Sequence, residues 1–139
     1  MKKLFSIVLM LLSVCVIGCN DNDDTFGEPK DKPYFYVEYY GSHWASVDFN
    51  QTCTMTITDE NGKDVNYTLS NGSRKVVIGP VYVGFKASLK MSAPKDGGTD
   101  GRISIARNQD HYFTQYGYFS NAKKEETVTY TILKDTGEY

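Results

Sequence analysis

The chain has 139 residues, of which 23% are charged, and its formal net charge at pH 7 is -2. This length allows one domain with a core of adequate size after a leader is removed. Beyond residue 33 the charges are nearly balanced and form no basic patch, which argues against nucleic-acid binding.

Residues 1–18 have the pattern of a lipoprotein signal peptide. A short basic start precedes an apolar stretch over residues 4–17, which is too short to span a bilayer as a mature helix. The small Gly18 suits cleavage directly before Cys19. We expect acyl chains on Cys19 and a stable membrane anchor, with an ordinary secretory signal as the alternative.

The sequence Val16-Ile17-Gly18-Cys19 resembles the lipobox of bacterial lipoproteins. The acidic run at residues 20–24 is similar to the export signal of surface-exposed lipoproteins in Bacteroidetes. This resemblance covers residues 1–24 and implies an outer-membrane protein that faces the cell exterior, with a periplasm-facing anchor as the alternative. It also implies a setting among surface lipoproteins that capture glycans or assemble with outer-membrane partners.

Residues 19–33 are expected to form a flexible linker that begins at the lipidated cysteine. They hold five acidic side chains and almost nothing apolar except Phe26, so they cannot bury enough surface to become ordered. The domain then occupies residues 34–139. Cys53 is its one cysteine, which excludes a disulfide framework.

The domain shows period-two alternation of apolar and polar side chains and no helical stripe. Thr52–Thr58 is the clearest strand, with Cys53, Met55 and Ile57 on one side and threonines on the other. The longest apolar face follows alternate positions from Val81 to Met91. The other expected strands are Tyr34–Tyr40, Val65–Leu69, Lys75–Ile78, Arg102–Arg107, Tyr112–Phe119 and Thr127–Ile132.

Turn residues separate these strands. Asn61-Gly62 suits a tight hairpin, and Pro94–Gly101 reads as a longer Asp/Gly loop. Seven or eight short strands predict a single all-β domain, an immunoglobulin-like antiparallel β-sandwich, with a small barrel as the alternative. Residues 78–82 followed by Ala87 resemble the tyrosine-corner region of fibronectin type III domains, which supports the sandwich.

The residues suited to catalysis are few. His43 and His111 are the only histidines, and the sequence has neither a Gly-x-Ser-x-Gly elbow nor a zinc-ligand spacing. We therefore predict no enzyme activity, no catalytic residue and no cofactor. Asp96 and Asp100 form a weak calcium candidate, and the alternative is a plain turn whose Asp and Gly residues serve the backbone.

Tyr40, His43 and Trp44 form the first candidate ligand site, around a predicted bend. Sugar rings present apolar C–H faces that stack on aromatic planes, so this group is a candidate glycan platform. The alternative is that the single tryptophan fills the core.

The predicted strand Tyr112–Phe119 carries the second candidate site. Its three tyrosines, Tyr112, Tyr116 and Tyr118, are expected on one face, opposite two phenylalanines. A strand with aromatic side chains on both faces requires either a covering loop or a partner. The tyrosines are therefore either covered or part of a contact surface.

These features predict a non-catalytic, lipid-anchored cell-surface β-sandwich that acts as a binding or accessory module, with glycans as the first ligand class. The alternative is a protein–protein assembly or structural subunit at the outer membrane. An enzyme is the third hypothesis and has the least support.

Overall fold

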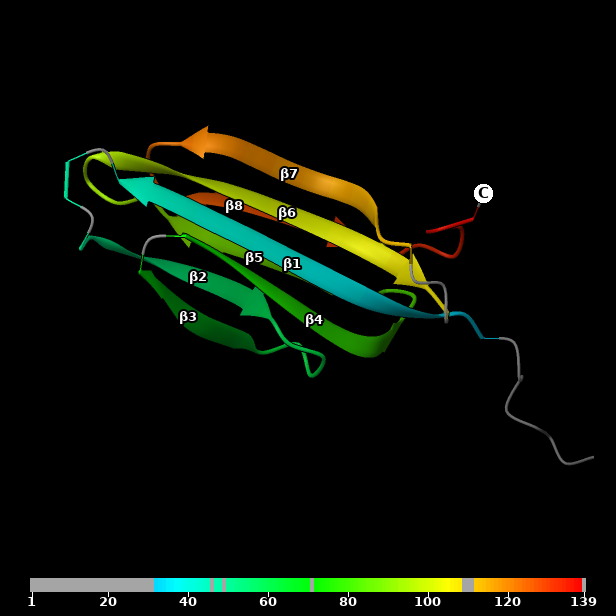
Figure 1. Cartoon of the computed structure of the whole chain (residues 1–139). Helices are drawn as coiled ribbons and strands as arrows, with labels where there is room; N and C mark the ends of the chain where they lie inside the picture. Colours follow the sequence, from blue (N-terminus) through cyan, green and yellow to red (C-terminus); the bar gives the residue numbers. More distant parts are fainter. Residues whose placement is uncertain (1–31, 46, 49, 71, 109–111, 139) are drawn as a thin grey trace, which may run out of the picture. The chain divides into compact units, whose positions relative to one another are not determined.

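A computed structural model describes residues 32–45, 47, 48, 50–70, 72–108 and 112–138. This part of the chain contains eight strands and no helix (Figure 1). The predicted signal peptide, Cys19, most of the linker and His111 lie outside these residues. Lys32–Tyr139 form a compact unit. No helix among the described residues is long and apolar enough to cross a membrane. The strands are β1 (Tyr34–Ala45), β2 (Thr52–Thr58), β3 (Asp64–Ser70), β4 (Gly72–Tyr82), β5 (Lys86–Ser92), β6 (Gly97–Arg107), β7 (Thr114–Ala122) and β8 (Glu126–Thr131).

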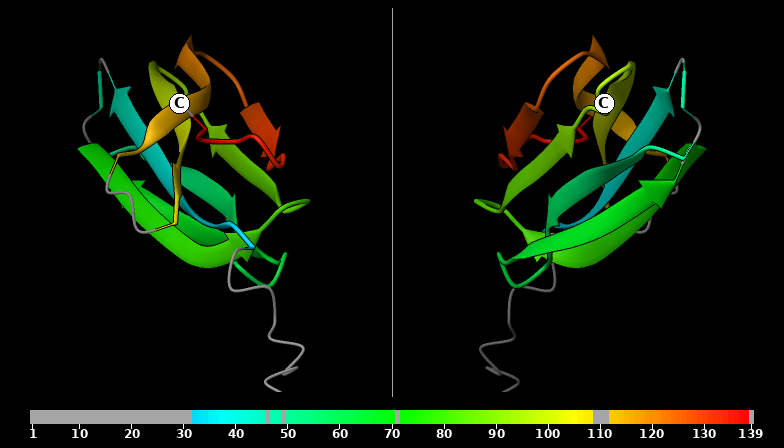
Figure 2. Two further views of the ribbon diagram at one scale, coloured as in Figure 1. Left: turned by 90° about the vertical axis from the view of Figure 1, so that its right-hand side faces the viewer. Right: turned by 90° about the vertical axis from the view of Figure 1, so that its left-hand side faces the viewer.

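The strands form two four-stranded sheets that pack face to face (Figure 2). Sheet A has the order β4-β1-β6-β7, sheet B has the order β3-β2-β5-β8, and every pairing is antiparallel. The predicted antiparallel β-sandwich is confirmed. Here β1 and β2 lie in opposite sheets, whereas the first two strands of an immunoglobulin domain lie in one sheet.

Alternation of side chains builds the core, as the sequence predicts. Along β2 the side chains of Cys53, Met55 and Ile57 are buried, while Thr52 and Thr54 are exposed. Each sheet buries one face against the other, and the removal of this apolar surface from water stabilises the sandwich. The largest fully buried side chains are Tyr39, Phe35, Met55, Ile57, Leu89, Met91, Ile103, Ile105, Ile132, Val37 and Thr99.

The predicted bend after Tyr40 is wrong, because β1 continues without interruption to Ala45. It pairs with β4 as far as His43 and with β6 to its end. Gly41 permits this at the core face, where a Cβ atom would lie 2.8 Å from the sulfur of Met91. A straight strand has a simple consequence: Tyr40 and Trp44 share one face, and His43 takes the other.

The apolar face predicted from Val81 to Met91 belongs to two strands in different sheets. A turn at Val83 and Gly84 ends β4 and sends the chain across to β5. Gly84 has a φ angle of 92°, which a residue with a side chain rarely adopts, and its N–H donates a 2.8 Å hydrogen bond to the carbonyl of Ile132. Val81, Ala87, Leu89 and Met91 still face the core, because the two sheets enclose it from opposite sides, whereas Val83 in the turn is 49% exposed, against the prediction.

The predicted loop Pro94–Gly101 is wrong in its second half, because β6 begins at Gly97. Residues 97–101 pair with the end of β1, from Ala45 back to Gly41. Any side chain at Gly97 would collide with the backbone carbonyl of Trp44. Glycine here serves a close approach of two strands, and the sequence alone does not distinguish this role from that of a turn residue.

Candidate binding face

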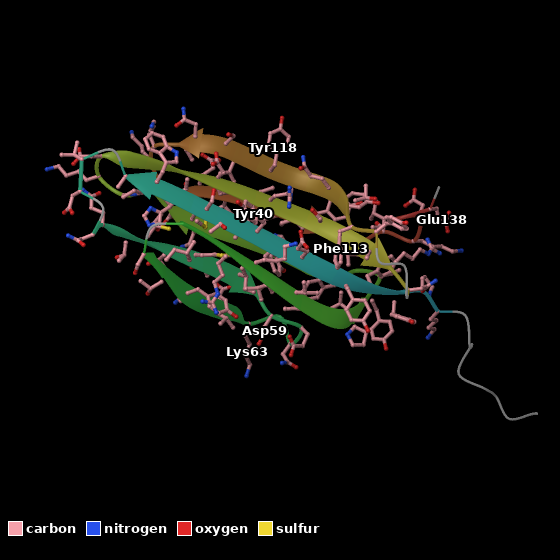
Figure 3. The ribbon with its side chains drawn as sticks, in the orientation of Figure 1. Tyr40, Asp59, Lys63, Phe113, Tyr118 and Glu138 are labelled. Carbon is pink, nitrogen blue, oxygen red and sulfur yellow. The ribbon has the colours of Figure 1, made fainter. Side chains whose placement is uncertain are left out.

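The outer surface of sheet A carries rings and charges in addition to the small polar side chains expected on a solvated sheet. We call it the aromatic face. Strand alternation and register place Tyr40 and Trp44 from β1 and Tyr118 from β7 on this side, with Tyr118 at the level of Tyr40; Figure 3 labels Tyr40 and Tyr118. Its members are Tyr34, Tyr36, Glu38, Tyr40, Ser42, Trp44, Ser73, Lys75, Val77, Tyr82, Gly98, Asp100, Arg102, Ser104, Gln115, Tyr118 and Ser120.

A row of four side chains crosses sheet A at one level, from β4 to β7. Lys75 pairs with Tyr40, Tyr40 with Arg102, and Arg102 with Tyr118. The Arg102 guanidinium lies 5.1 Å from the centre of the Tyr40 ring, which is a cation–π distance. Tyr118, at the end of the row, is 68% exposed. The row therefore alternates cations with rings.

Glu38 fixes the two cations of this row. Its side chain is only 8% exposed, and its two oxygens lie 2.9 Å from Lys75 Nζ and 3.4 Å from Arg102 Nη2. A carboxylate shielded from water binds cations more strongly than one on an open surface. Tyr40 therefore lies between two cations that one anion holds in place, which limits the movement of all three groups.

Asp100 connects β6 with its neighbours on both sides. One oxygen accepts hydrogen bonds from the Ser120 hydroxyl and the Asn121 N–H, both at 2.8 Å, and the other accepts one from the Ser42 hydroxyl at 3.3 Å. The Asn121 N–H has the largest effect on the pKa of Asp100 and lowers it; burial opposes this, and the two hydroxyls add to the lowering, so the pKa lies below its ordinary value of 3.8. The carboxylate is thus a fixed anion at neutral pH.

Trp44 lies near the end of β1 with its ring on the aromatic face. The ring packs against Gly98, where a Cβ atom would lie 3.0 Å from Cζ2, and 40% of the residue is exposed. Lys123, from the connection between β7 and β8, places its ammonium 3.9 Å from the ring centre. The ring is therefore positioned by the sheet beneath it, and the alternative that Trp44 fills the core is wrong.

His43 does not join Tyr40 and Trp44, although the sequence groups them. Its position in β1 points the side chain between the sheets, where it is buried. The predicted group of three is therefore reduced to two rings, which straddle Ser42 on the outer side.

Tyr116 is also separated from the tyrosines predicted to accompany it. The register of β6 against β7 shifts between Ile103 and Ser104, which pair with Gly117 and Gln115, so Tyr116 is an extra residue in a β-bulge. Its ring packs 4.5 Å from that of Tyr130 in sheet B, and its hydroxyl accepts a 2.6 Å hydrogen bond from the Gly137 N–H. The bulge thus turns Tyr116 inward, against the alternation predicted for this strand.

Tyr112 and Tyr118 are exposed, in keeping with the contact-surface alternative for these two residues. Tyr112 precedes β7 and lies outside the strands, so only Tyr118 belongs to the aromatic face. Phe119, on the opposite side of β7, packs over Gly101, whose missing side chain leaves room for the ring.

The calcium candidates occupy different environments. Asp96 lies in the turn before β6, within 3.4 Å of the Gln51 side chain, whereas Asp100 lies within β6 and binds the neighbouring strands. Among the described residues, no three His, Cys, Asp or Glu side chains are grouped so that they could hold a metal ion.

A shallow depression with a volume of about 340 Å³ lies on the outer side of sheet B. It opens at the surface between the β2–β3 hairpin and strands β5 and β8. Its lining consists of Thr58, Gly62, Phe85, Lys86, Ser88 and Thr129. Hydroxyl groups and one lysine dominate this lining, and it contains neither a histidine nor a carboxylate.

The ionic part of the aromatic face is absent from the sequence-based prediction. Glu38, Lys75 and Arg102 are far apart in the chain and meet only through the register of β1 with β4 and β6. The alternation of Tyr36, Glu38 and Tyr40 does place a charge among rings, and this is the one local signal that points to the network. Comparison with known proteins found no matching family model, no similar curated protein and no similar solved structure.

Proposed function

We propose that this protein is a non-catalytic, lipid-anchored carbohydrate-binding domain of the outer membrane, facing the cell exterior, and that it binds its ligand on the aromatic face. The observation that carries the proposal is the pair of exposed rings, Trp44 and Tyr118, positioned on one sheet surface among fixed polar groups. Apolar groups gathered on one surface and rimmed by polar residues are typical of interaction sites.

A sugar needs both components of such a surface. Its C–H faces stack on aromatic rings, while its hydroxyls require hydrogen-bond donors and acceptors. The aromatic face supplies the polar groups through Ser42, Asp100 and Arg102, which lie between the two rings. Preorganised rings and charges also reduce the entropy lost when a ligand binds.

The position of Trp44 within the domain suits an anchored binder. The chain enters the domain at Tyr34, and Trp44 lies roughly 33 Å further along β1 at about 3.3 Å per residue. A linker from a lipidated Cys19 would join the domain at its Tyr34 end, so Trp44 would lie at the end away from the point of attachment.

A glycan array tests the carbohydrate function. The full chain, purified in detergent, is compared with Trp44→Ala and with Tyr112→Ala, which removes an exposed ring outside the aromatic face. We expect binding to a restricted set of glycans, loss of signal for Trp44→Ala and little change for Tyr112→Ala. Absence of binding to every glycan would contradict the proposal.

The anchor is tested separately. Mass spectrometry of the mature protein should find acyl chains on Cys19, and Cys19→Ser should abolish them. Proteinase treatment of intact cells should degrade the wild-type protein, and protection of the protein would instead place it on the periplasmic side.

Assembly with another protein is the second candidate function, and one observation favours it. Strand β7 lies at an open edge of sheet A and contains no charged residue over Thr114–Ala122, whereas β4, at the other edge, carries Arg74, Lys75 and Pro80. Charges and prolines at sheet edges discourage pairing with foreign strands. Cross-linking from a cysteine at exposed Ser120 in intact cells tests this alternative, because a bound partner strand would be captured there.

A further inference from the structure

The exposed charges of the aromatic face are mainly positive, because its two carboxylates are already engaged. Glu38 is shared between Lys75 and Arg102, and its side chain is 8% exposed, against 58% and 40% for the two cations. Asp100 accepts three hydrogen bonds from neighbouring strands. A ligand that approaches from solvent therefore meets rings and cations, while the anions lie beneath or between them.

Lys123 adds a cation at the Trp44 end of this surface. Its ammonium lies 3.9 Å from the centre of the Trp44 ring, and no carboxylate among the described residues lies within ion-pairing distance of it. A lysine over an exposed ring is held weakly, and its flexible stem allows the ammonium to turn toward an anion. The ring and the cation are thus available to the same ligand.

We propose that the ligand of the aromatic face is an acidic glycan, a polymer of uronic acids, in which one sugar ring stacks on Trp44 while its carboxylate pairs with Lys123. The inference rests on the proposed carbohydrate function and specifies the ligand class. A neutral sugar that stacks on Trp44 displaces the ammonium and gives it no new partner. A uronic acid offers the same ring face and replaces the lost contact with an ion pair.

The rest of the surface fits a polymer rather than a single sugar. Arg102 lies two positions beyond Asp100 along β6 and next to Tyr118. Tyr118 and Arg102 therefore give the sheet a second ring and a second exposed cation, further from the Trp44 end of the surface. Repeated uronic acids present ring faces and carboxylates in alternation along an extended chain. The aromatic face presents rings and cations in the same alternation.

Trp44 makes the test direct, because it is the single tryptophan of the chain and its fluorescence reports on the site. The full chain is titrated with polygalacturonate and with the methyl ester of the same polymer, which keeps the sugar backbone and removes the charge. We expect a saturable fluorescence change with polygalacturonate that weakens as salt is added, and at least tenfold weaker binding of the methyl ester.

Two variants separate the role of Lys123 from a general effect of charge. Lys123→Gln should weaken binding of polygalacturonate about fivefold to tenfold and leave binding of the methyl ester unchanged. Lys124→Gln, at the exposed neighbouring position in the same connection, should change either affinity less than twofold. Equal thermal unfolding of the two variants shows that both remain folded.

The other possible results of these experiments show which of the two proposals fails. Equal affinity for the acid and the ester, or equal effects of the two lysine variants, would overturn it while the carbohydrate function stands. Polyphosphate binding that matches polygalacturonate and is unaffected by Trp44→Ala, both measured by titration calorimetry because the variant lacks the fluorescent tryptophan, would show a general anion contact and also overturn it. A glycan array without any ligand would remove the proposed function itself, which distinguishes the two failures.

Discussion

The two outer faces of the sandwich belong to sheets of four strands each, yet they differ in composition. Outward positions of sheet B carry hydroxyls, lysines, one amide and one carboxylate and no aromatic ring; we call this surface the threonine face. Its members are Thr52, Thr54, Thr56, Thr58, Asp64, Asn66, Thr68, Ser70, Lys86, Ser88, Lys90, Ser92, Thr127, Thr129 and Thr131. Threonine suits a solvated strand, because its branched side chain favours extended backbone and its hydroxyl binds water.

The interactions of the two faces differ in the same way. On the threonine face, Thr56 donates a 2.7 Å hydrogen bond to the side chain of Asn66 across the β2–β3 pair. On the aromatic face, Glu38 and Asp100 each join three strands. The threonine face thus has the composition expected of a solvated sheet surface, whereas the aromatic face also carries rings and ionic links that solvation does not require. This difference locates the proposed function on sheet A.

The largest expected effect on stability comes from glycine positions in the two sheets. Gly97→Ala places a methyl group against the Trp44 carbonyl and should cost about 3 kcal/mol, because β1 and β6 must separate. Gly62→Ala in the β2–β3 hairpin of sheet B meets no atom within 4 Å and should cost about 1 kcal/mol, for its φ angle of 76° alone. Urea unfolding measures both, and equal losses would contradict the close approach at Gly97.

The ionic network gives the next largest effect. Glu38→Gln leaves Lys75 and Arg102 without their anion and should lower the free energy of unfolding by about 1–2 kcal/mol, since the carboxylate is shielded but its partners are partly exposed. Thr54→Ala on the threonine face is the matched control and should change it by less than about 0.5 kcal/mol. A Glu38 variant as stable as the control would show that the network contributes nothing.

A smaller effect should appear in the pH dependence of stability. Because the folded pKa of Asp100 is lowered, first by the Asn121 N–H, its contribution is full above pH 3.8 and is lost as the pH falls through the folded pKa. The difference in unfolding free energy between wild type and Asp100→Asn should therefore be constant from pH 7 to about pH 5 and shrink below pH 4. A difference that does not change down to pH 2 would contradict the hydrogen-bonded carboxylate.

The sequence predicts those features of the fold that depend on the alternation of apolar and polar side chains within single strands. The bounds of β2 and the inward set of Cys53, Met55 and Ile57 follow from period-two patterning, as does the two-layered antiparallel fold. The sequence also indicates Trp44 and Tyr118 as candidate ligand-binding residues, because aromatic side chains suited to stacking can be identified without a structure.

The rest depends on how strands meet, which alternation does not specify. The inward turn of Tyr116 needs a bulge whose extra residue is defined only against β6. The burial of His43 needs β1 to run straight through Gly41, and the pairing of Glu38 with Arg102 needs the register of distant strands. Turn residues also mislead where glycine serves close packing, as at Gly97.

The most direct test of the account is NMR mapping of the domain surface with and without the glycan that the array identifies. We predict that the perturbed backbone amides cluster on β1, β6 and β7, around Tyr40, Trp44, Arg102 and Tyr118, while those of sheet B stay unchanged. Perturbations centred on the threonine face, or around the depression between β5 and β8, would contradict the assignment of binding to the aromatic face.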